Sequence, residues 1–242
     1  MKLHKIIKLE KSFVLHIRPY KETSLVVDLF TENYGRVSTL AKGAKKPKSS
    51  LRAIKIPTSL NYVSFQGKKE LKILTHCENI QHYSLSAGLP TNCVIYLNEL
   101  LIKFLQSEDP HKRIFNEYRM TLDSLGEKLN TERISNLLRS FELLLLQEVG
   151  YGINFGSEAK SGKRISEELL YSFDPMQGFI VSKFSNTPQE YLFKGKDILN
   201  FAKGDLSSLD TIRASKHIMR KALDNHLENR TLRAREVLFN KR

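Results

Sequence analysis

Residues 24–52 read SLVVDLFTENYGRVSTLAKGAKKPKSSLR, and this stretch decides the fold expected for the first third of the chain. Residues 24–31 are rich in β-branched and aromatic side chains, which is typical of a strand. A tight turn at residues 32–35 follows, and Gly35 suits its positive-φ position. Residues 36–42 then predict a second strand, so we expect an antiparallel hairpin here.

The same stretch continues into a strongly basic loop without any acidic residue. Gly43 and Pro47 disfavour a helix in it. Cations this close together repel one another and favour a polyanion, whose released counterions supply binding energy. A solvated basic loop without a partner remains the alternative. The five cations of this loop are Lys42, Lys45, Lys46, Lys48 and Arg52.

Three further strands are expected around the hairpin, at residues 12–18, 60–66 and 70–78. Alternating apolar and polar positions predict the last two. Five short antiparallel strands favour a small barrel, and the OB-fold is the commonest five-stranded solution. OB-fold loops and faces bind single strands, although a fold alone does not establish a function.

From Pro90 onward the hydrophobic period changes to that of helices. Helices are expected to begin near residues 90, 110 and 131, and the third is apolar on nearly all sides, which is typical of a buried helix. A small hairpin at residues 169–184 and helices at 189–201, 207–223 and 232–239 follow. We therefore predict a multi-domain α and β protein: an OB-fold barrel at 1–80, and a helical bundle at 81–242 with a β-hairpin insertion at 156–185 that lacks zinc ligands.

Composition narrows the class of protein. The formal net charge is +13, and the excess of Lys and Arg lies in residues 1–80 and 203–242, which favours a localised anionic partner. Two cysteines, Cys77 and Cys93, are too few for a disulfide scaffold or a four-cysteine zinc site. Apolar runs such as Leu143–Leu146 are far too short to span a membrane. A cytoplasmic protein without a signal peptide is expected.

The chain contains no motif of a zinc protease, serine hydrolase or nucleotide-binding loop. The acidic residues of the predicted barrel are scattered, whereas a metal-dependent nuclease needs several that converge. We therefore expect no enzymatic activity and no cofactor.

Aromatic residues near the basic loop are candidates for stacking bases, as in single-strand binders. Filling the barrel core is the alternative for each, although two of them lie in connections between strands. These candidates are Tyr20, Tyr34, Tyr62 and Phe65.

An ordered set of short motifs resembles the RecO family of recombination mediators and DNA repair proteins. The N-terminal motifs are Phe13–His16, Arg18–Pro19, Glu22–Leu25, Phe30–Glu32, Gly35–Arg36 and Ala41–Ala44. The helical and C-terminal motifs are Leu97–Leu101, Arg139–Leu143, Gly150–Phe155, Thr211–Ala214 and Leu232–Glu236.

The resemblance implies an OB-fold followed by helices, and binding of single- and double-stranded DNA. It also implies annealing of complementary strands, and loading of RecA with RecR onto DNA coated by single-strand-binding protein, in the bacterial cytoplasm at the nucleoid. Many members of the family carry a four-cysteine zinc module after the Gly-Tyr-Gly turn. Residues 156–184 contain no cysteine or histidine, so we predict no zinc here.

Two sets of site residues follow. Besides the five cations of the basic loop, Arg36, Lys68 and Lys69 are secondary DNA-binding candidates. The acidic tail of single-strand-binding protein needs an apolar pocket and a cation. For that tail we predict Arg139 at the rim of an apolar groove beside Phe141, assisted by Lys216 or Arg220.

Two other functions stay open. An RNA-binding OB-fold protein in translation would prefer RNA to DNA of matched sequence. A protein–protein adaptor with incidental basic ends would show no salt-dependent binding of nucleic acid.

Overall fold

The computed structural model describes residues 6–182, 191–227 and 231–235. The chain forms two compact units, one of Met1–Leu129 with Leu232–Arg242 and one of Asn130–Thr231. The expected domain boundary near residue 80 is where strands give way to helices. By its contacts, however, the first unit continues through two helices beyond that point, because they pack on the barrel.

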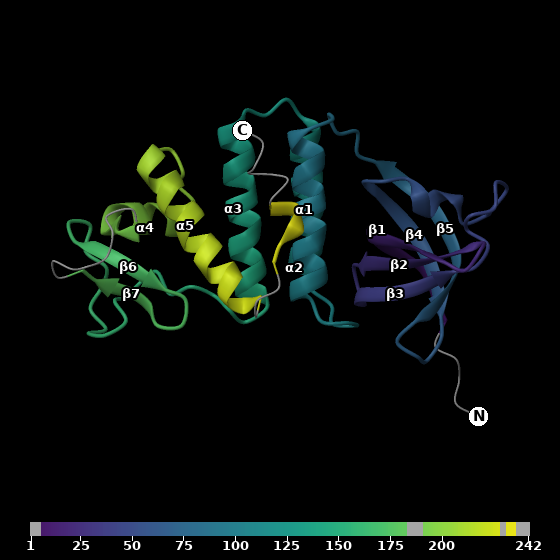
Figure 1. Ribbon diagram of the computed structural model, residues 1–242, viewed down its shortest axis with the longest axis horizontal. Coiled ribbons are helices and arrows are strands. Elements are labelled where there is room, and N and C mark those ends of the chain that lie inside the picture. Colours follow the sequence, from purple (N-terminus) through teal and green to yellow (C-terminus); the bar gives the residue numbers. More distant parts are fainter. Residues whose placement is uncertain (1–5, 183–190, 228–230, 236–242) are drawn as a thin grey trace. The chain divides into compact units, whose positions relative to one another are not determined.

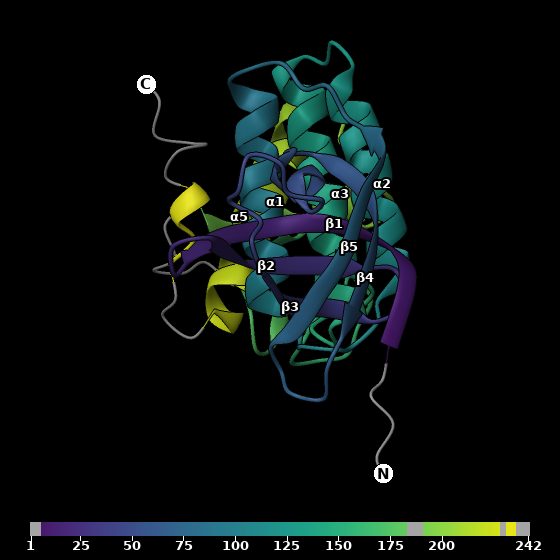
Figure 2. The ribbon, with the colours of Figure 1, turned by 90° about the vertical axis from the view of Figure 1, so that its right-hand side faces the viewer.

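The first unit contains a closed five-stranded barrel with the strand order β1-β2-β3-β5-β4, the arrangement of an OB-fold (Figure 2). Neighbouring strands are antiparallel, apart from a short parallel pairing of β3 with β5. The strands are β1 (Ile6–Tyr20), β2 (Ser24–Thr31), β3 (Gly35–Ala41), β4 (Ser59–Gln66) and β5 (Lys72–His82).

Strand β1 is longer than the expected residues 12–18 because it serves two sides of the barrel. Residues 12–20 pair with β2, and residues 6–13 pair with β4. An irregularity between Ile7 and Glu10, where Leu9 has a φ of +51°, interrupts the pairing with β4, and another between Val14 and His16 interrupts the pairing with β2. Such irregularities increase the local twist of a strand.

The barrel interior is filled by alternating apolar residues, as the strand patterns predict. Val27, Leu29, Val37 and Val63 are almost completely buried there. The segment between β3 and β4 adds to this core, because its own apolar side chains are buried in it: Ala44, Leu51 and Ile54. The basic loop is therefore a folded segment that ends in a short 3₁₀ helix, η1 (Arg52–Lys55).

Helices α1 (Leu89–Phe104) and α2 (Lys112–Gly126) also belong to the first unit. Phe13 of β1 packs against Phe115 and Tyr118 of α2, with ring centroids 5.2 and 4.9 Å apart. Asn98 of α1 donates to the carbonyl oxygen of Leu15 at 3.1 Å. These contacts hold the helices on the outside of the barrel, so Phe13 packs there and not in the barrel interior.

The second unit combines helices with a small sheet of order β7-β6-β8 (Figure 1). Aromatic residues form part of its core, including Phe155, Phe173, Phe179 and Phe201, whose rings contact one another. Its elements are α3 (Thr131–Glu148), β6 (Leu170–Asp174), β7 (Gly178–Val181), β8 (Phe193–Lys194), α4 (Gly195–Ala202) and α5 (Leu209–His226).

The expected hairpin is confirmed in β6 and β7, where the Asp174 side chain accepts from the backbone amides of Met176 and Gln177 at 2.9 Å. Residues 183–185 of the predicted insertion lie outside the described residues. The helix expected at 189–201 was wrong at its start, because residues 193–194 pair with β6 as β8. Its residues 189–190, and residues 236–239 of the last expected helix, also lie outside the described residues.

Candidate nucleic-acid interface

The cations of the basic loop are presented by a series of tight turns. The amides of Lys46, Ser49 and Arg52 each donate to the carbonyl oxygen three residues earlier, at 3.1–3.2 Å. Buried apolar residues of the same segment anchor these turns in the barrel core. Four of the five cations are exposed as a result: Lys42, Lys46, Lys48 and Arg52.

Lys45 differs from its neighbours because it is half-buried and holds the loop in place. Its Nζ donates to the carbonyl oxygen of Lys21 at 2.8 Å, and its backbone amide donates to that of Thr23 at 2.9 Å. These contacts tie the basic loop to the turn between β1 and β2. The lysine therefore has a structural contact in addition to its charge.

The secondary DNA-binding candidates also divide into exposed cations and one cation that makes structural contacts. Lys68 and Lys69 are exposed in the turn between β4 and β5. Arg36, by contrast, donates from Nε to the carbonyl oxygen of Leu105 at 3.1 Å, and its own carbonyl accepts from the amide of Glu108. Arg36 therefore fastens the connection between α1 and α2 to the barrel.

A polar network lies on the outer face of β1, β2 and β3. Asp28 is only 5% exposed, and its carboxylate accepts from Ser38 Oγ at 2.5 Å and from Arg18 Nη2 at 3.4 Å. Sequence reasoning did not single out Arg18 as a site residue. Strand alternation was the available signal, since it places Arg18 and Tyr20 on one face of β1.

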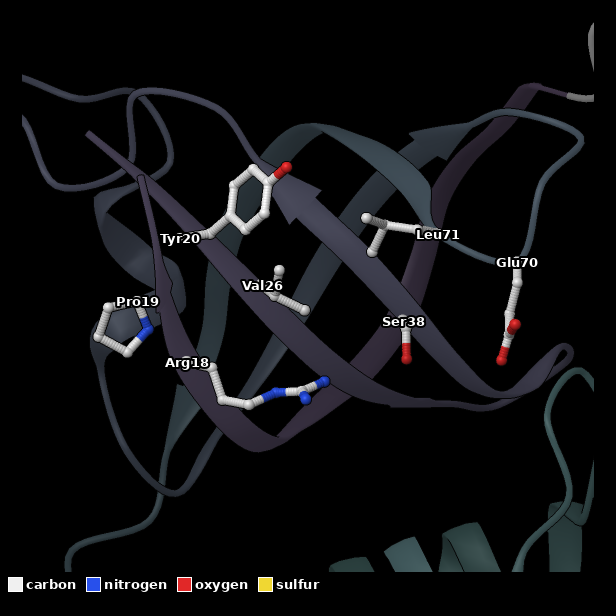
Figure 3. Close-up of a pocket in the computed structure, with 7 residues that line it drawn as sticks. All are labelled: Arg18, Pro19, Tyr20, Val26, Ser38, Glu70 and Leu71. Atoms are coloured by element: carbon white, nitrogen blue, oxygen red, sulfur yellow. The ribbon is translucent and has the colours of Figure 1, made fainter. Parts of the chain in front are cut away.

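A cavity of about 370 Å³ opens beside this network. Figure 3 shows Tyr20 and Leu71 on either side of Val26, with the Arg18 side chain extending toward Ser38. The residues that line the cavity are Arg18, Pro19, Tyr20, Val26, Ser38, Glu70 and Leu71.

Of the four aromatic candidates, Tyr20 is the one that lines this cavity, and it is 40% exposed. Phe65 is buried in the barrel core, and Tyr34 packs against its ring with centroids 6.0 Å apart. Tyr62 is half-buried on β4. The structure therefore separates a surface aromatic from core aromatics that the sequence pattern did not distinguish.

The expected position of Arg139 at the rim of a groove was wrong, because this residue is buried. Arg139 is 4% exposed and Glu142 is 0% exposed on helix α3. Their side chains form an ion pair, with Nη2 and Oε1 2.6 Å apart. Phe141 is also buried, whereas Lys216 and Arg220 are exposed on α5. The four predicted tail-binding residues thus divide into two buried on α3 and two exposed on α5.

The region after the Gly-Tyr-Gly turn does not fit a zinc ion. Apart from Glu158, its buried side chains are apolar or aromatic, including Ile165, Tyr171 and Phe179. Within the described ranges, no group of three or more His, Cys, Asp or Glu side chains is placed to hold a metal. A turn closed by Glu158 stands in this region: its Oε2 accepts from the amide and the hydroxyl of Ser161 at 2.6 and 2.5 Å.

Both cysteines are buried, and neither forms a disulfide. Burial raises the pKa of the Cys77 thiol to about 12, so this thiol stays protonated near neutral pH. No helix in the described part of the chain is long and apolar enough to cross a membrane.

Two family models match nearly the whole chain. "Recombination protein O N terminal" matches residues 6–83, and "Recombination protein O C terminal" matches residues 90–236.

Curated relatives agree with these matches, and each carries the name DNA repair protein RecO. The protein of Polynucleobacter asymbioticus is 37% identical over 231 residues, covering 95% of both chains. That of Actinobacillus pleuropneumoniae serotype 3 is 38% identical, covering 95% of this chain and 94% of the relative. That of Cupriavidus metallidurans is 37% identical, covering 95% of this chain and 76% of the relative.

Proposed function

The chain belongs to the RecO family of DNA repair proteins, and from this we propose that it is a recombination mediator without catalytic activity. In this proposal it binds single- and double-stranded DNA and anneals complementary strands. With RecR, it helps to load RecA onto DNA coated by single-strand-binding protein.

The observation that carries the proposal is the group of exposed cations on one segment of an OB-fold barrel. Lys42, Lys46, Lys48 and Arg52 are held outward by a segment whose apolar residues are buried in the barrel core. A fixed array of cations needs little ordering when it meets a phosphate chain, so less of the interaction free energy is lost. Lys68 and Lys69 add charge from the turn between β4 and β5.

Annealing requires no acid–base chemistry. Two complementary strands repel each other through their phosphates, and bound cations reduce that repulsion. The bases must remain able to pair, so the cations should contact phosphates and leave most base edges open. Lysine and arginine side chains on a surface segment can do both.

We propose that DNA binds residues 1–80 and that the tail of single-strand-binding protein binds residues 81–242. RecR and the tail of single-strand-binding protein are the partners in this proposal. Lys216 and Arg220 are exposed on α5, where Arg220 Nε lies 3.8 Å from Asp224 Oδ2, and we propose that these two cations contact the acidic tail. Arg139 would bind the tail only by exchanging Glu142 for the tail carboxylate, and Phe141, close to it in the sequence, is buried. A cytoplasmic protein at the nucleoid is proposed with this role.

A fluorescence annealing assay tests the function. Complementary oligonucleotides, one with a donor dye and one with an acceptor, should anneal faster with the protein, and the acceleration should decline as salt increases. Strands of unrelated sequence are the control. No acceleration would contradict the annealing proposal, and stronger binding to RNA than to DNA of the same sequence would favour an RNA-binding role.

A further inference from the structure

The cavity on the barrel face has the character of a binding site for a flat, mostly apolar group. Its volume of about 370 Å³ lies within the range of small-molecule sites, about 300–1,000 Å³. It joins an aromatic ring and aliphatic side chains to a few polar groups, as such sites do. We propose that this cavity holds one unpaired nucleobase stacked on Tyr20, an inference that rests on the proposed binding of single-stranded DNA.

The apolar part of the cavity suits a base. Tyr20 and Leu71 are each 40% exposed, and Figure 3 shows them on either side of Val26. A base between these side chains would contact the tyrosine ring and cover apolar surface that is now open to water. Stacking of this kind tolerates any sequence because every base has an aromatic face.

The polar part favours a neutral base over a phosphate. The buried carboxylate of Asp28 offsets the charge of Arg18 at 3.4 Å, and the carboxylate of Glu70 lines the cavity. Two acidic groups would repel a phosphate. A base edge, however, carries both donors and acceptors, so it can accept from Arg18 and donate to Glu70.

A peptide bond and a hydrogen bond connect the cavity to the basic loop. Lys21 follows Tyr20, and its Nζ lies 5.6 Å from the centroid of the tyrosine ring. The carbonyl oxygen of Lys21 in turn accepts from Lys45 Nζ of the basic loop. A strand whose phosphates contact the loop can therefore place a base on the neighbouring ring.

The site discriminates between single and paired strands. A base within a duplex is stacked and paired, so it cannot enter the cavity without opening the helix, at a cost of a few kcal/mol. A single stacked contact is also weak enough for the base to be released when a complementary strand pairs with it. Such a site would keep an unpaired strand bound without blocking annealing.

Abasic oligonucleotides test the inference because they keep the phosphates and lack the bases. We expect the wild-type chain to bind an oligothymidine about tenfold more tightly than an abasic oligonucleotide of the same length, which corresponds to ~1.4 kcal/mol and to one stacked base. Tyr20→Ala should reduce this preference to about twofold or less and leave binding of the abasic oligonucleotide unchanged. Tyr20→Phe, which keeps the ring, should retain the preference.

A matched pair of aliphatic variants, one inside the cavity and one outside it, tests whether the loss of any exposed apolar side chain has the same effect. Leu71→Ala should weaken the preference, whereas Ile80→Ala should not, since Ile80 is 41% exposed on β5 and does not line the cavity. Thermal unfolding would check that each variant is folded.

The outcomes separate this inference from the proposed function. A full preference for bases in Tyr20→Ala overturns the cavity proposal while DNA binding stands. Failure of the wild-type chain to bind either oligonucleotide overturns the DNA-binding function itself. The last experiment repeats the comparison with an RNA oligonucleotide and its abasic counterpart. A preference for bases that is present only in RNA would overturn the proposal that the cavity binds a base of DNA.

Discussion

Arg139 and Glu142 form a buried ion pair on helix α3, one turn apart. Breaking a buried ion pair by removing one partner costs about 3–5 kcal/mol. Arg139→Ala should therefore lower the free energy of unfolding by about that amount, measured by chemical denaturation. Replacing both, with Arg139→Met and Glu142→Leu, should restore most of the stability, because similar apolar pairs are often neutral or stabilising.

The double variant also tests the predicted tail contact without the complication of unfolding. If Arg139 binds the carboxylate of an acidic tail peptide, the folded double variant should bind that peptide about tenfold less tightly, since a charge-assisted contact contributes about 1.5–3 kcal/mol. Undiminished peptide binding would remove Arg139 from the interface.

Gly35 allows the connection between α1 and α2 to approach the hairpin of β2 and β3. Its φ is +63°, and a Cβ atom there would lie 1.9 Å from the carbonyl oxygen of Asp109. Gly35→Ala should lower the free energy of unfolding by about 2–4 kcal/mol through strain and displacement of this connection. Gly204→Ala is the control: its φ is also positive, yet no described atom lies within 4 Å of the added carbon, so a loss of only ~1 kcal/mol is expected. Equal losses would contradict the close approach.

At the scale of elements, the basic loop and its anchor have separate roles. The triple variant Lys42→Glu, Lys46→Glu and Lys48→Glu should weaken DNA binding by about tenfold or more, because it removes cations that are proposed to contact phosphates. The chain should remain folded, since all three side chains are exposed and exposed charges contribute little to stability. Lys45 is left unchanged because its Nζ holds the loop. For the wild-type chain, a log–log plot of affinity against salt should have a slope of roughly −3 to −6.

Lys160, Lys163 and Lys196 provide the matched control, because they are exposed in the second unit and their replacement by Glu changes the net charge equally. We expect a much smaller effect from this control triple. A similar loss in both triples would mean that net charge, and not the loop, governs binding.

The turn at Glu158 makes part of the second unit sensitive to acid. Hydrogen bonds from the side chain and backbone of Ser161 lower the pKa of Glu158 to about 2. The carboxylate therefore stabilises the turn above its unfolded pKa of about 4.3, and this contribution is lost as pH falls toward 2. In Ser161→Ala, a titration followed by NMR should show the pKa of Glu158 closer to its usual value. An unshifted pKa would contradict this cause.

At the scale of the whole molecule, neither unit is expected to need a metal. Structural zinc takes four Cys or His ligands, and the region after the Gly-Tyr-Gly turn instead has a core of apolar and aromatic side chains. Elemental analysis should find no stoichiometric zinc in the purified protein, and a chelator should leave its unfolding temperature unchanged. About one zinc ion per chain would contradict this prediction.

Helix boundaries were predicted less well than helices. Helix α3 begins at Thr131, as predicted, and Asn130 caps it by accepting from the amide of Arg133 at 2.8 Å. The helix predicted from residue 207 begins instead at Leu209, and Ser208 is its cap and accepts from Thr211. Two neighbouring serines offer the same hydroxyl, so only the path of the chain into the helix decides which one is used.

The sequence by itself determined the family, the five strands of the barrel and the helices that follow, because these depend on local periodicity, turn residues and the order of short motifs. Tertiary structure alone decided which of the candidate side chains are exposed and can contact a ligand. Arg36 and Arg139 are bound within the fold, Lys45 is partly so, and Tyr20 remains at the surface. The physical reason is that burial and pairing depend on what packs opposite a residue, and those partners come from distant parts of the chain or from turns that periodicity does not describe.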